Sequence, residues 1–548
     1  MRKTLIIIAI VVLHVSLLYI AIEGNHLPTT AFNKNIALYR YIIMPLLGLL
    51  TGFAFFLLSF KGRLHMPDKI KEFSAVHYKK IIIVISVLYF VVFAVMAYLR
   101  FESFNTNYFD MGIFGHKIWG ISVSNTLPDA IKASLAGHFQ PILLMYGLLF
   151  KFYPSVHIVV LSQVLFMTLS VIALFSIFKM YIEDRVWLIV LVVIFFLYPQ
   201  TEFNTISVFH PDFFYLFFCL WAYRFSLRGR HTAALIAITA GALTKETFII
   251  GALFFSFYVA FDKKGRRPAI IFAMVFLVLI SAALFYIFVL LPKNLASFMD
   301  NFSYIGEALH NPSVLFHSIL KFIDRKVFFV IFQFLPFLFI PFLRLKELIP
   351  AVPFFIISFL SVNHLHSSLD SHYSVANIAP VFVSLTIALK GLNDRYGKNF
   401  TGSVLLFILI MVATFNIAHS PSPVSLNFLK QGWSDTWHRR NYIIGPHEET
   451  LSKAVAIIPK DGNVKVVCQN NAYGGDIANR DSLEVFPRMW QQAGYIILDL
   501  KRPLFLYDSV NNADYMREFE KLRQSENFRV VFEVDQVYVF MKNIGNSP

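Results

Sequence analysis

The sequence predicts an α-helical protein that crosses a lipid bilayer many times and carries a small α/β domain at its C-terminal end. Of its 548 residues, 57% are hydrophobic and only 15% are charged, whereas about a quarter of the residues are charged in a soluble globular protein. Apolar runs suited to membrane-spanning helices, which need about 20 residues, recur from residue 4 to residue 418. The stretch after residue 418 is polar and breaks this pattern.

The apolar runs predict roughly thirteen spans. They cover residues 4–22, 38–60, 80–99, 157–180, 186–200, 211–227, 231–244, 247–261, 268–291, 326–343, 347–361, 374–390 and 401–418. The first run follows a basic start and lacks a small-residue cleavage pattern, so we interpret it as a retained anchor. We expect a two-helix N-terminal extension at 1–79, a transmembrane core at 80–418 and the polar domain at 419–548.

The distribution of charge predicts the orientation in the membrane. A net charge of +15 would also suit a nucleic-acid binder, but Lys and Arg gather in alternate loops, such as 61–80, 262–267 and 390–399. Cytoplasmic loops of membrane proteins collect these residues. We therefore expect no nucleic-acid partner, a place in the cell (inner or cytoplasmic) membrane, a cytoplasmic N-terminus and an extracytoplasmic C-terminal domain.

The C-terminal stretch has the pattern of a small α/β domain. Helical periodicity near 447–458 and 512–524 alternates with strand-like runs at 464–468 and 495–500. Residues 530–540 have the form of two short strands around a tight turn. No glycine-rich phosphate-binding motif is present, and the pattern indicates no function for this domain. The two cysteines, Cys219 in a predicted span and Cys468 in the tail, are not expected to pair.

Unusual ionisable residues gather in the loops that are expected outside. The set consists of Asp110, His116 and His138 in loop 100–156, Glu202, His210 and Asp212 around loop 200–210, Lys245 and Glu246 between two apolar halves, and His364, His366, Asp370 and His372 in loop 362–373. A charge at bilayer depth costs at least ~2.5 kcal/mol, which favours a polar cavity or a helical turn at the outer face. We expect Asp110, His138, His210, Lys245 and His372 to converge on one cavity there.

Several of these residues also have a purely structural interpretation. Asp110 precedes an apolar, helix-like stretch and would suit an N-cap. His210 precedes a proline and would suit a turn at the membrane interface. Lys245 and Glu246 would neutralise each other as an ion pair. Both interpretations stay open for each residue.

Loop 362–373 raises the question of a metal ion. Imidazole and carboxylate are common ligands of zinc and similar ions, which makes His364, His366, Asp370 and His372 candidates. Two histidines that flank one residue in a loop are not a fixed-geometry motif, so this signal is weak. The cofactor stays unknown, and a divalent metal ion is the class that these residues suggest.

Six stretches, taken in order, carry a resemblance to a known family. They are FDMGIFGHKIW at 109–119, GHFQPILLMYGLLFKFYP at 137–154, the segment around Gln163, FHPDFFYLFF at 209–218, TKE at 244–246 and SHYSVANIAP at 371–380. With them the chain resembles a bacterial and archaeal family of multi-spanning membrane proteins of unknown function within the GT-C superfamily of glycosyltransferases. The resemblance runs from about residue 95 to about residue 390, with a weaker echo in the tail. His116 departs from it, because a glutamine would be expected there.

The resemblance implies a GT-C-like fold and a polyprenyl-phosphate-linked sugar as donor, held at the surface of the membrane lipid. Asp110 matches the acidic residue at the reaction centre and would be the general base. Lys245 and some of His138, His210 and His372 would face the phosphate, and Asp212 and Glu246 would orient these groups. His116, Trp119, Tyr198 and Tyr373 would contact substrate, although packing within the core is the more common outcome for aromatic rings.

Two other functions compete with this hypothesis. A lipid or solute transporter or flippase also has many spans and polar residues at membrane depth, but the chain shows no internal repeat. A non-catalytic membrane assembly protein would use its tail to bind a partner. The sequence does not indicate the donor sugar, the acceptor or the oligomeric state.

Overall fold

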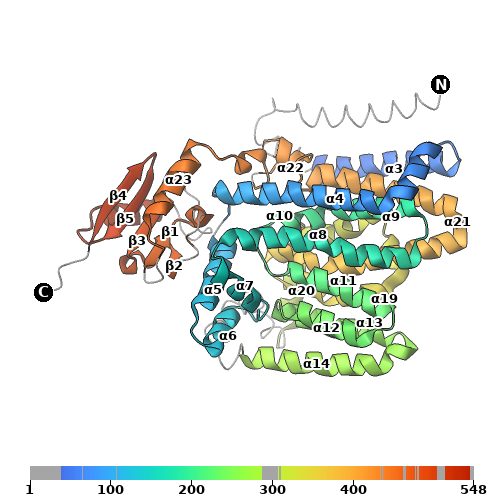
Figure 1. Ribbon diagram of the computed structural model, residues 1–548, viewed down its shortest axis with the longest axis horizontal. Helices are drawn as coiled ribbons and strands as arrows, with labels where there is room; N and C mark the ends of the chain where they lie inside the picture. The colour runs from blue at the N-terminus through green and yellow to red at the C-terminus, as the bar shows by residue number, and fades with distance from the viewer. Residues whose placement is uncertain are drawn as a thin grey trace. The chain divides into compact units, whose positions relative to one another are not determined.

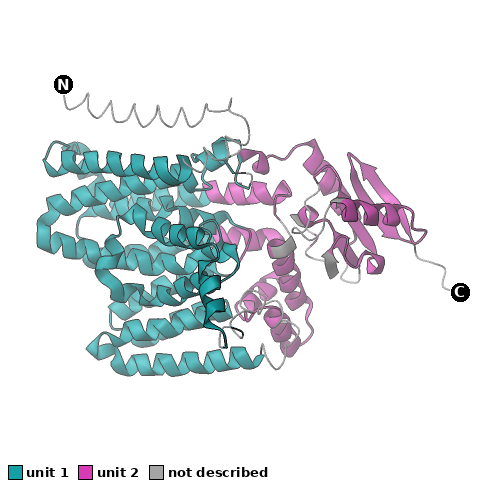
Figure 2. Ribbon diagram, turned by 180° about the vertical axis from the view of Figure 1, so that it is seen from behind, with its two compact units in different colours: residues 1–91, 165–207, 212–438 teal, residues 92–164, 208–211, 439–548 magenta. Residues whose placement is uncertain are grey.

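The computed structural model describes residues 39–543 except 65, 107, 287–306, 308, 309, 432, 435, 461–463, 475, 476, 478–480 and 503–511. Most of these residues form helices (Figure 1). The chain divides into two compact units (Figure 2). Unit 1 consists of Met1–Val91, Leu165–Ser207 and Asp212–His438, and unit 2 consists of Val92–Val164, Val208–Pro211 and Arg439–Pro548.

Unit 1 is built from long helices that lie side by side (Figure 1). Its helical elements are η1 (Tyr39–Ile43), α3 (Met44–Phe60), the first part of α4 (Asp68–Glu102), most of α8 (Val156–Tyr181), α9 (Arg185–Leu197), α10 (Pro199–Ile206), α11 (Phe213–Leu227), α12 (His231–Ala242), α13 (Glu246–Ala260), η3 (Lys263–Gly265), α14 (Arg266–Phe285), α17 (Pro312–Leu320), α18 (Ile323–Phe334), η6 (Leu335–Phe337), η7 (Ile340–Arg344), α19 (Leu345–Leu348), η8 (Ile349–Ala351), α20 (Val352–Leu360), η9 (His364–Ser367), η10 (His372–Ser374), α21 (Val375–His419) and α22 (Leu426–Leu429).

The helices confirm a multi-pass membrane protein. Among the described residues, five helices are long and apolar enough to cross a membrane, or up to seven if each of two bent pairs is one span. Four shorter apolar helices, of 10–17 residues, accompany them: Leu143–Phe152, Phe213–Leu227, His231–Ala242 and Glu246–Ala260. The expected span 4–22 lies outside the described residues. The number of roughly thirteen spans therefore stays a prediction.

The expected spans 374–390 and 401–418 belong to one element, α21, of 45 residues. A straight helix of that length would measure about 68 Å, more than twice the ~30 Å of a hydrocarbon core. Gly397 interrupts it with a non-helical backbone, φ 80° and ψ 171°, which a residue without a side chain adopts at low cost. We therefore interpret α21 as two span-length arms joined at Gly397.

Two further predicted spans are bent. Helices α9 and α10 meet at an angle of 54° beside Pro199, and the pair Ile323–Phe337 and Ile340–Leu360 bends by 85°. At the second bend, Leu338 and Phe339 have left-handed backbone conformations. Helix α10 is buried along its whole length, although five of its eight residues are polar. The bend after α9 thus places polar side chains inside unit 1.

A small-residue motif joins α3 to α21. Gly48 and Gly52, one turn apart on α3, face α21, and a Cβ atom on Gly52 would lie 2.2 Å from the Phe407 ring. Small residues at this spacing allow helices to approach closely in a membrane, where van der Waals contact replaces the hydrophobic effect as the driving force. The glycines therefore determine how closely these two helices pack.

Unit 2 combines the segment between α4 and α8 with the tail. Its elements are η2 (Tyr108–Gly112), α5 (Ile113–Val123), α6 (Leu127–Leu135), α7 (Leu143–Phe152), η11 (Arg439–Tyr442), α23 (Pro446–Ile457), β1 (Lys465–Cys468), η12 (Asn470–Gly474), β2 (Asp481–Val485), η14 (Trp490–Gln492), β3 (Tyr495–Asp499), α24 (Asn512–Arg523), β4 (Phe528–Val534) and β5 (Val537–Lys542).

The tail forms a five-stranded sheet in the order β2-β1-β3-β5-β4. Strands β1, β2 and β3 are parallel, and β5 runs antiparallel to both β3 and β4. Side chains of α23, such as Leu451, pack on one face of the sheet, and side chains of α24, such as Phe519, pack on the other. The expected α/β domain is confirmed, including the tight turn at Asp535 and Gln536, which both have positive φ. Strand β2 was not expected, because this edge strand is polar.

We predict that Gly52→Ala destabilises the protein by about 1–3 kcal/mol, because the added methyl group overpacks the contact with Phe407. The midpoint of thermal unfolding in detergent measures the effect. Gly391→Ala, on α21, is the matched control, since a Cβ atom there meets nothing within 4 Å. Equal midpoints for the two variants would contradict the close packing of α3 on α21.

Candidate functional site

Asp110 lies in η2, a single π-helical turn that continues directly into α5. Gly112 occupies the position before α5, and no side chain caps that helix. The interpretation of Asp110 as an N-cap is therefore wrong. Single π-helical turns occur frequently at functional sites, where they redirect a side chain. The side chain of Asp110 is 34% exposed, so a molecule in solution or at a lipid surface reaches it.

His210 is the partner of Asp110. Its Nε2 atom lies 3.1 Å from Oδ1 of Asp110, and its Nδ1 atom lies 3.0 Å from the carbonyl oxygen of Val208. A carbonyl oxygen only accepts hydrogen bonds, so Nδ1 carries a proton. The contact between Nε2 and the carboxylate then needs one further proton, held by the ring or by Asp110. The two side chains form an acid–base pair.

Neighbouring side chains hold the His210 ring in place. Phe114 of α5 packs edge-on against it at a centroid distance of 5.3 Å, and also against Phe209. Tyr146 of α7 packs on Phe209 from another side. The side-chain oxygen of Gln163 accepts a hydrogen bond from the backbone N–H of His210, at 3.2 Å. Gln163 was recognised only as part of a family motif, since a glutamine in an apolar run indicates no specific role.

The remaining polar residues of loop 100–156 have different surroundings. Lys117 is buried and donates to the side-chain oxygen of Gln140 at 2.7 Å. His116 stacks on Trp119 with ring centroids 5.9 Å apart. His138 is exposed, between α6 and α7. The structure brings Asp110 and His210 into contact. It stays a prediction that all five residues converge on one cavity: Asp110, His138, His210, Lys245 and His372.

Unit 1 contains a second cluster around Asp212, which is buried at the N-terminal end of α11. Its Oδ2 atom lies 3.5 Å from Nζ of Lys245 and 3.7 Å from Nε2 of His372. Neither carboxylate oxygen of Asp212 has a hydrogen-bond partner. The three side chains are thus close enough for strong electrostatic attraction, but too far apart for good hydrogen bonds.

Lys245 stays charged in this cluster. Burial alone would lower the pKa of Lys245, but the Asp212 carboxylate, with smaller effects from Tyr373 and Glu246, raises that pKa above its usual value. The ammonium group also lies over the Tyr373 ring, 4.9 Å from its centroid. The structure pairs Lys245 with Asp212. Glu246, the partner that the sequence suggested, is a second and weaker source of negative charge near Lys245.

The four candidate metal ligands of loop 362–373 are not gathered into one group. Among the described residues, no group of three or more His, Cys, Asp or Glu side chains is arranged to hold a metal ion. His364 packs near Phe322, His366 packs against Tyr373, and Asp370 accepts a hydrogen bond from Ser368. His372 lies beside Asp212, and His366 senses the charge of Lys245. The metal interpretation of this loop stays a prediction.

Tyr198 is a core residue. Its ring is buried against Phe337 and Phe382, and its hydroxyl donates to the backbone carbonyl of Gln333 at 3.1 Å. For Tyr198, this packing agrees with a role in the core rather than in substrate contact. Tyr373 differs, because its ring lies beneath Lys245 and beside His366 and His372.

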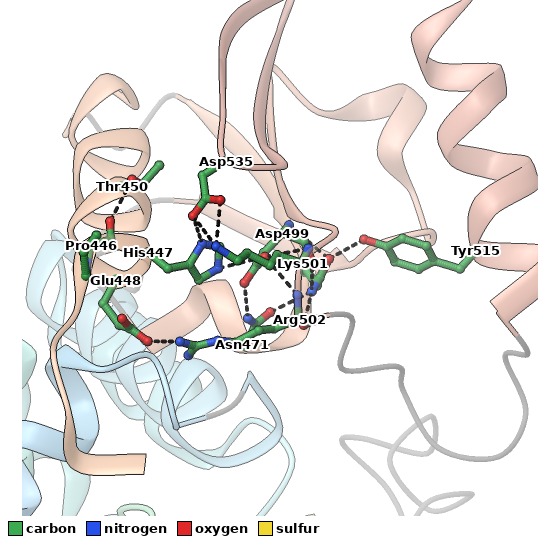
Figure 3. A network of polar contacts seen from close by, with 11 residues as sticks. Pro446, His447, Glu448, Thr450, Asn471, Asp499, Lys501, Arg502, Tyr515 and Asp535 are labelled. Carbon is green, nitrogen blue, oxygen red and sulfur yellow. Dashed lines mark hydrogen bonds and ion pairs between the residues drawn. The ribbon is translucent and has the colours of Figure 1, made fainter. Parts of the chain in front are cut away.

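A third polar cluster, in the tail domain, was not anticipated from the sequence (Figure 3). His447 of α23 lies between two carboxylates: Nε2 is 3.1 Å from Asp499, at the end of β3, and Nδ1 is 2.7 Å from Asp535, in the turn before β5. Asn471 and two backbone N–H groups also donate to the fully buried Asp499. Because these donors satisfy Asp499, we interpret the cluster as a joint that attaches α23 to the sheet.

A known family matches most of the chain. A sequence model of the family described as "Predicted membrane protein (DUF2079)" matches residues 100–539. This confirms the resemblance to a family of multi-spanning membrane proteins of unknown function. The match reaches further into the tail than the expected limit near residue 390, so the α/β domain is part of the family pattern.

Comparison with solved structures gives a distant likeness. The crystal structure of ArnT from Cupriavidus metallidurans in the apo state has a TM-score of 0.46 and 13% sequence identity. The alignment covers 83% of this chain and 97% of that chain. Comparison with curated protein sequences gave no match.

We predict that Asp212→Asn destabilises the protein by about 3–5 kcal/mol, because it leaves the buried Lys245 ammonium without its counter-charge. The double variant Asp212→Asn/Lys245→Met removes both charges and should recover much of the loss. The midpoint of thermal unfolding reports both effects. A double variant no more stable than the single one would show that the pair is not energetically coupled.

We also predict a pH dependence that originates in His366. Burial lowers the pKa of His366 to about 4, and the positive charge of Lys245 contributes in the same direction. The folded state therefore binds fewer protons than the unfolded state between pH 6.5 and 4. The stabilisation is fully present above pH 6.5 and is lost as the pH falls towards 4, by up to about 3 kcal/mol.

His366→Asn should flatten this dependence. The measurement is the midpoint of thermal unfolding as a function of pH for wild type and variant. If both midpoints fall equally between pH 6.5 and 4, the protonation of His366 is not the cause.

Proposed function

The chain belongs to the DUF2079 family of predicted membrane proteins, and on that premise we propose that it is a membrane glycosyltransferase of the GT-C type. It moves a sugar from a polyprenyl-phosphate-linked donor to an acceptor at the extracytoplasmic face. The observation that carries this proposal is the pairing of a partly exposed carboxylate, Asp110, with a buried imidazole, His210. Both lie in segments that border apolar helices.

Asp110 acts as the general base in this proposal. A hydroxyl group of the acceptor becomes a better nucleophile as it loses its proton, and a carboxylate at hydrogen-bonding distance accepts that proton. Because His210 donates from Nδ1 to Val208, its Nε2 atom faces Asp110 and shares a proton with it. The imidazole orients the carboxylate by donating this proton from Nε2, and the proton that Asp110 takes from the acceptor hydroxyl leaves to solvent, which reaches the partly exposed carboxyl group.

The Asp212 cluster suits the leaving phosphate. As the bond between sugar and phosphate breaks, negative charge accumulates on the phosphate, and cationic or donating groups stabilise it. Lys245 and His372 supply a charged ammonium group and an imidazole, and Asp212 orients both. Their separations of 3.5 and 3.7 Å leave these donors without tight mutual hydrogen bonds. Asp212 follows His210, the partner of Asp110, after one intervening residue, Pro211.

Other parts of the proposal rest on the sequence. The charge pattern supports a cytoplasmic N-terminus and an extracytoplasmic tail domain. The division at residue 79 is based on the family resemblance, and the division at residue 418 on the end of the apolar runs. His116, Trp119, His138, Glu246 and Tyr373 are assigned to the surroundings of donor and acceptor. The membrane lipid supplies the environment of the donor's isoprenoid chain.

A transporter is the second candidate, and the bent helices favour it. Interrupted helices at membrane depth are typical of carriers, where they expose polar groups to a substrate. The bend between α9 and α10 and the polar, buried α10 have this character. A carrier would move its substrate without breaking the bond between sugar and phosphate, which makes the two functions experimentally distinct.

We predict that Asp110→Asn reduces sugar transfer by about 10²–10⁴-fold, the usual contribution of a general base, without changing the thermal midpoint. Purified protein in lipid nanodiscs is incubated with radiolabelled polyprenyl-phosphate sugars and a membrane extract that contains acceptors. The release of polyprenyl phosphate and the labelled product are both measured.

Asp129→Asn is the matched control, because Asp129 is an exposed carboxylate in the same loop whose hydrogen bonds stay local to Thr126. It should keep full activity. No cleavage of any donor by wild type, together with transbilayer movement of the intact donor in vesicles, would favour the transporter. Equal cleavage by wild type and Asp110→Asn would remove Asp110 from the mechanism.

A further inference from the structure

Helix α7 of unit 2 has two apolar faces. Leu143, Tyr146, Gly147 and Phe150 are buried, and they form one stripe at helical spacing. The opposite stripe consists of Met145, Leu148, Leu149 and Phe152, which are exposed by 37%, 61%, 42% and 88%. A helix that borders water is polar on its outer face, whereas this outer face is apolar at every position of the stripe.

The length of α7 excludes a full membrane span. Its ten residues extend over about 15 Å, half of the ~30 Å hydrocarbon core of a bilayer. Helix α4 is long enough to cross a membrane. Its outward residues have similar exposed fractions, such as 60% for Ile83 and 62% for Leu88. The stripe therefore has the surface of a lipid-facing helix but spans only part of the bilayer.

The chain's course identifies what covers the stripe. Phe152 is followed after three residues by α8, which starts at Val156 and is a candidate membrane span. The C-terminal end of α7 thus lies where the chain enters the bilayer. Lys151 and Tyr153, which are exposed beside Phe152, are residue types that settle at the boundary between hydrocarbon and headgroups.

We propose that the outer stripe of α7 is buried in the lipid of one leaflet, so that α7 is an interfacial helix that anchors the segment between α4 and α8. The ligand of this surface is the acyl-chain region of the bilayer, and a second copy of the chain or another protein is the competing occupant. The proposal does not depend on the reaction that the protein performs.

The inner stripe of α7 connects this anchor to the acid–base pair. A Cβ atom on Gly147 would lie 2.1 Å from the side chain of Ile121, so α7 and α5 cross closely. Tyr146 packs on Phe209, next to His210, with ring centroids 5.4 Å apart. His210 in turn contacts Asp110. The depth of α7 in the leaflet consequently sets the depth of Asp110, at the level of the lipid headgroups.

Spin labels on the stripe test the proposal. The two native cysteines, Cys219 and Cys468, are buried and are first replaced by alanine. Single cysteines are then introduced by Leu148→Cys, Leu149→Cys and Phe152→Cys, and the labelled proteins are reconstituted into phosphatidylcholine–phosphatidylglycerol vesicles. Power saturation compares collisions with oxygen, which concentrates in hydrocarbon, and with a water-soluble nickel chelate.

Two control labels give the accessibilities expected in lipid and in water. Leu88→Cys lies on the exposed side of α4 and reports lipid, and Lys521→Cys lies on the polar side of α24 and reports water. We expect the three α7 labels to favour oxygen as the Leu88 label does. Accessibility to the nickel chelate equal to that of the Lys521 label would overturn the proposal. So would dipolar broadening that disappears on dilution with unlabelled protein, because a second copy would then cover the stripe.

Discussion

A buried charge needs a partner, and this constraint determines how unit 1 is assembled. Asp212 and Lys245 come from different helices and meet in the interior. Glu347 is fully buried beside Arg344 and Lys346. Lys326 instead donates to three backbone carbonyls, those of residues 318, 319 and 359, and so ties the end of α17 to the end of α20. Lys326 and the pair of Asp212 with Lys245 thus connect segments that are distant in sequence, whereas Glu347 and its two partners are close neighbours in the chain.

The same constraint distinguishes a structural charge from one available for chemistry. Lys326 is satisfied by hydrogen bonds of 2.8–3.2 Å and has no reason to move. Asp212 and Lys245 are held together by attraction across 3.5 Å, without a hydrogen bond to either carboxylate oxygen. A ligand with phosphate oxygens would offer Lys245 closer hydrogen-bond acceptors than Asp212 does at 3.5 Å. Asp110 differs again, because solvent reaches it and its partner is a titratable ring.

In the tail domain, buried polar groups form hydrogen bonds and ion pairs with other groups of the same domain. Its sheet has an apolar core on both faces, and the carboxyl ends of β1 and β3 carry Gln469 and Asp499, which bond to each other and to neighbouring loops. Arg502 pairs with Glu448, which also accepts a hydrogen bond from the backbone of Gly445 at the start of α23. These contacts connect the start of α23 to the end of β3, the central strand of the sheet.

The sequence by itself determined the membrane class, the positions of most helices and the α/β character of the tail, because hydrophobic periodicity and turn residues act over a few residues. It also identified Asp110, His210, Asp212, Lys245 and His372 as unusual, since charge is rare in an apolar chain. It did not reveal the bends, the joining of two predicted spans in the single element α21, or strand β2. These depend on packing between distant segments, which outweighs local preference.

Only the tertiary structure decided which polar residues are partners. The pairing of Asp110 with His210, of Asp212 with Lys245 and His372, and of His447 with two carboxylates joins positions far apart along the chain. Electrostatic and hydrogen-bonding energy depends on distances of a few ångströms. Those distances arise from the packing of whole helices and strands, and a linear pattern of residues does not contain them.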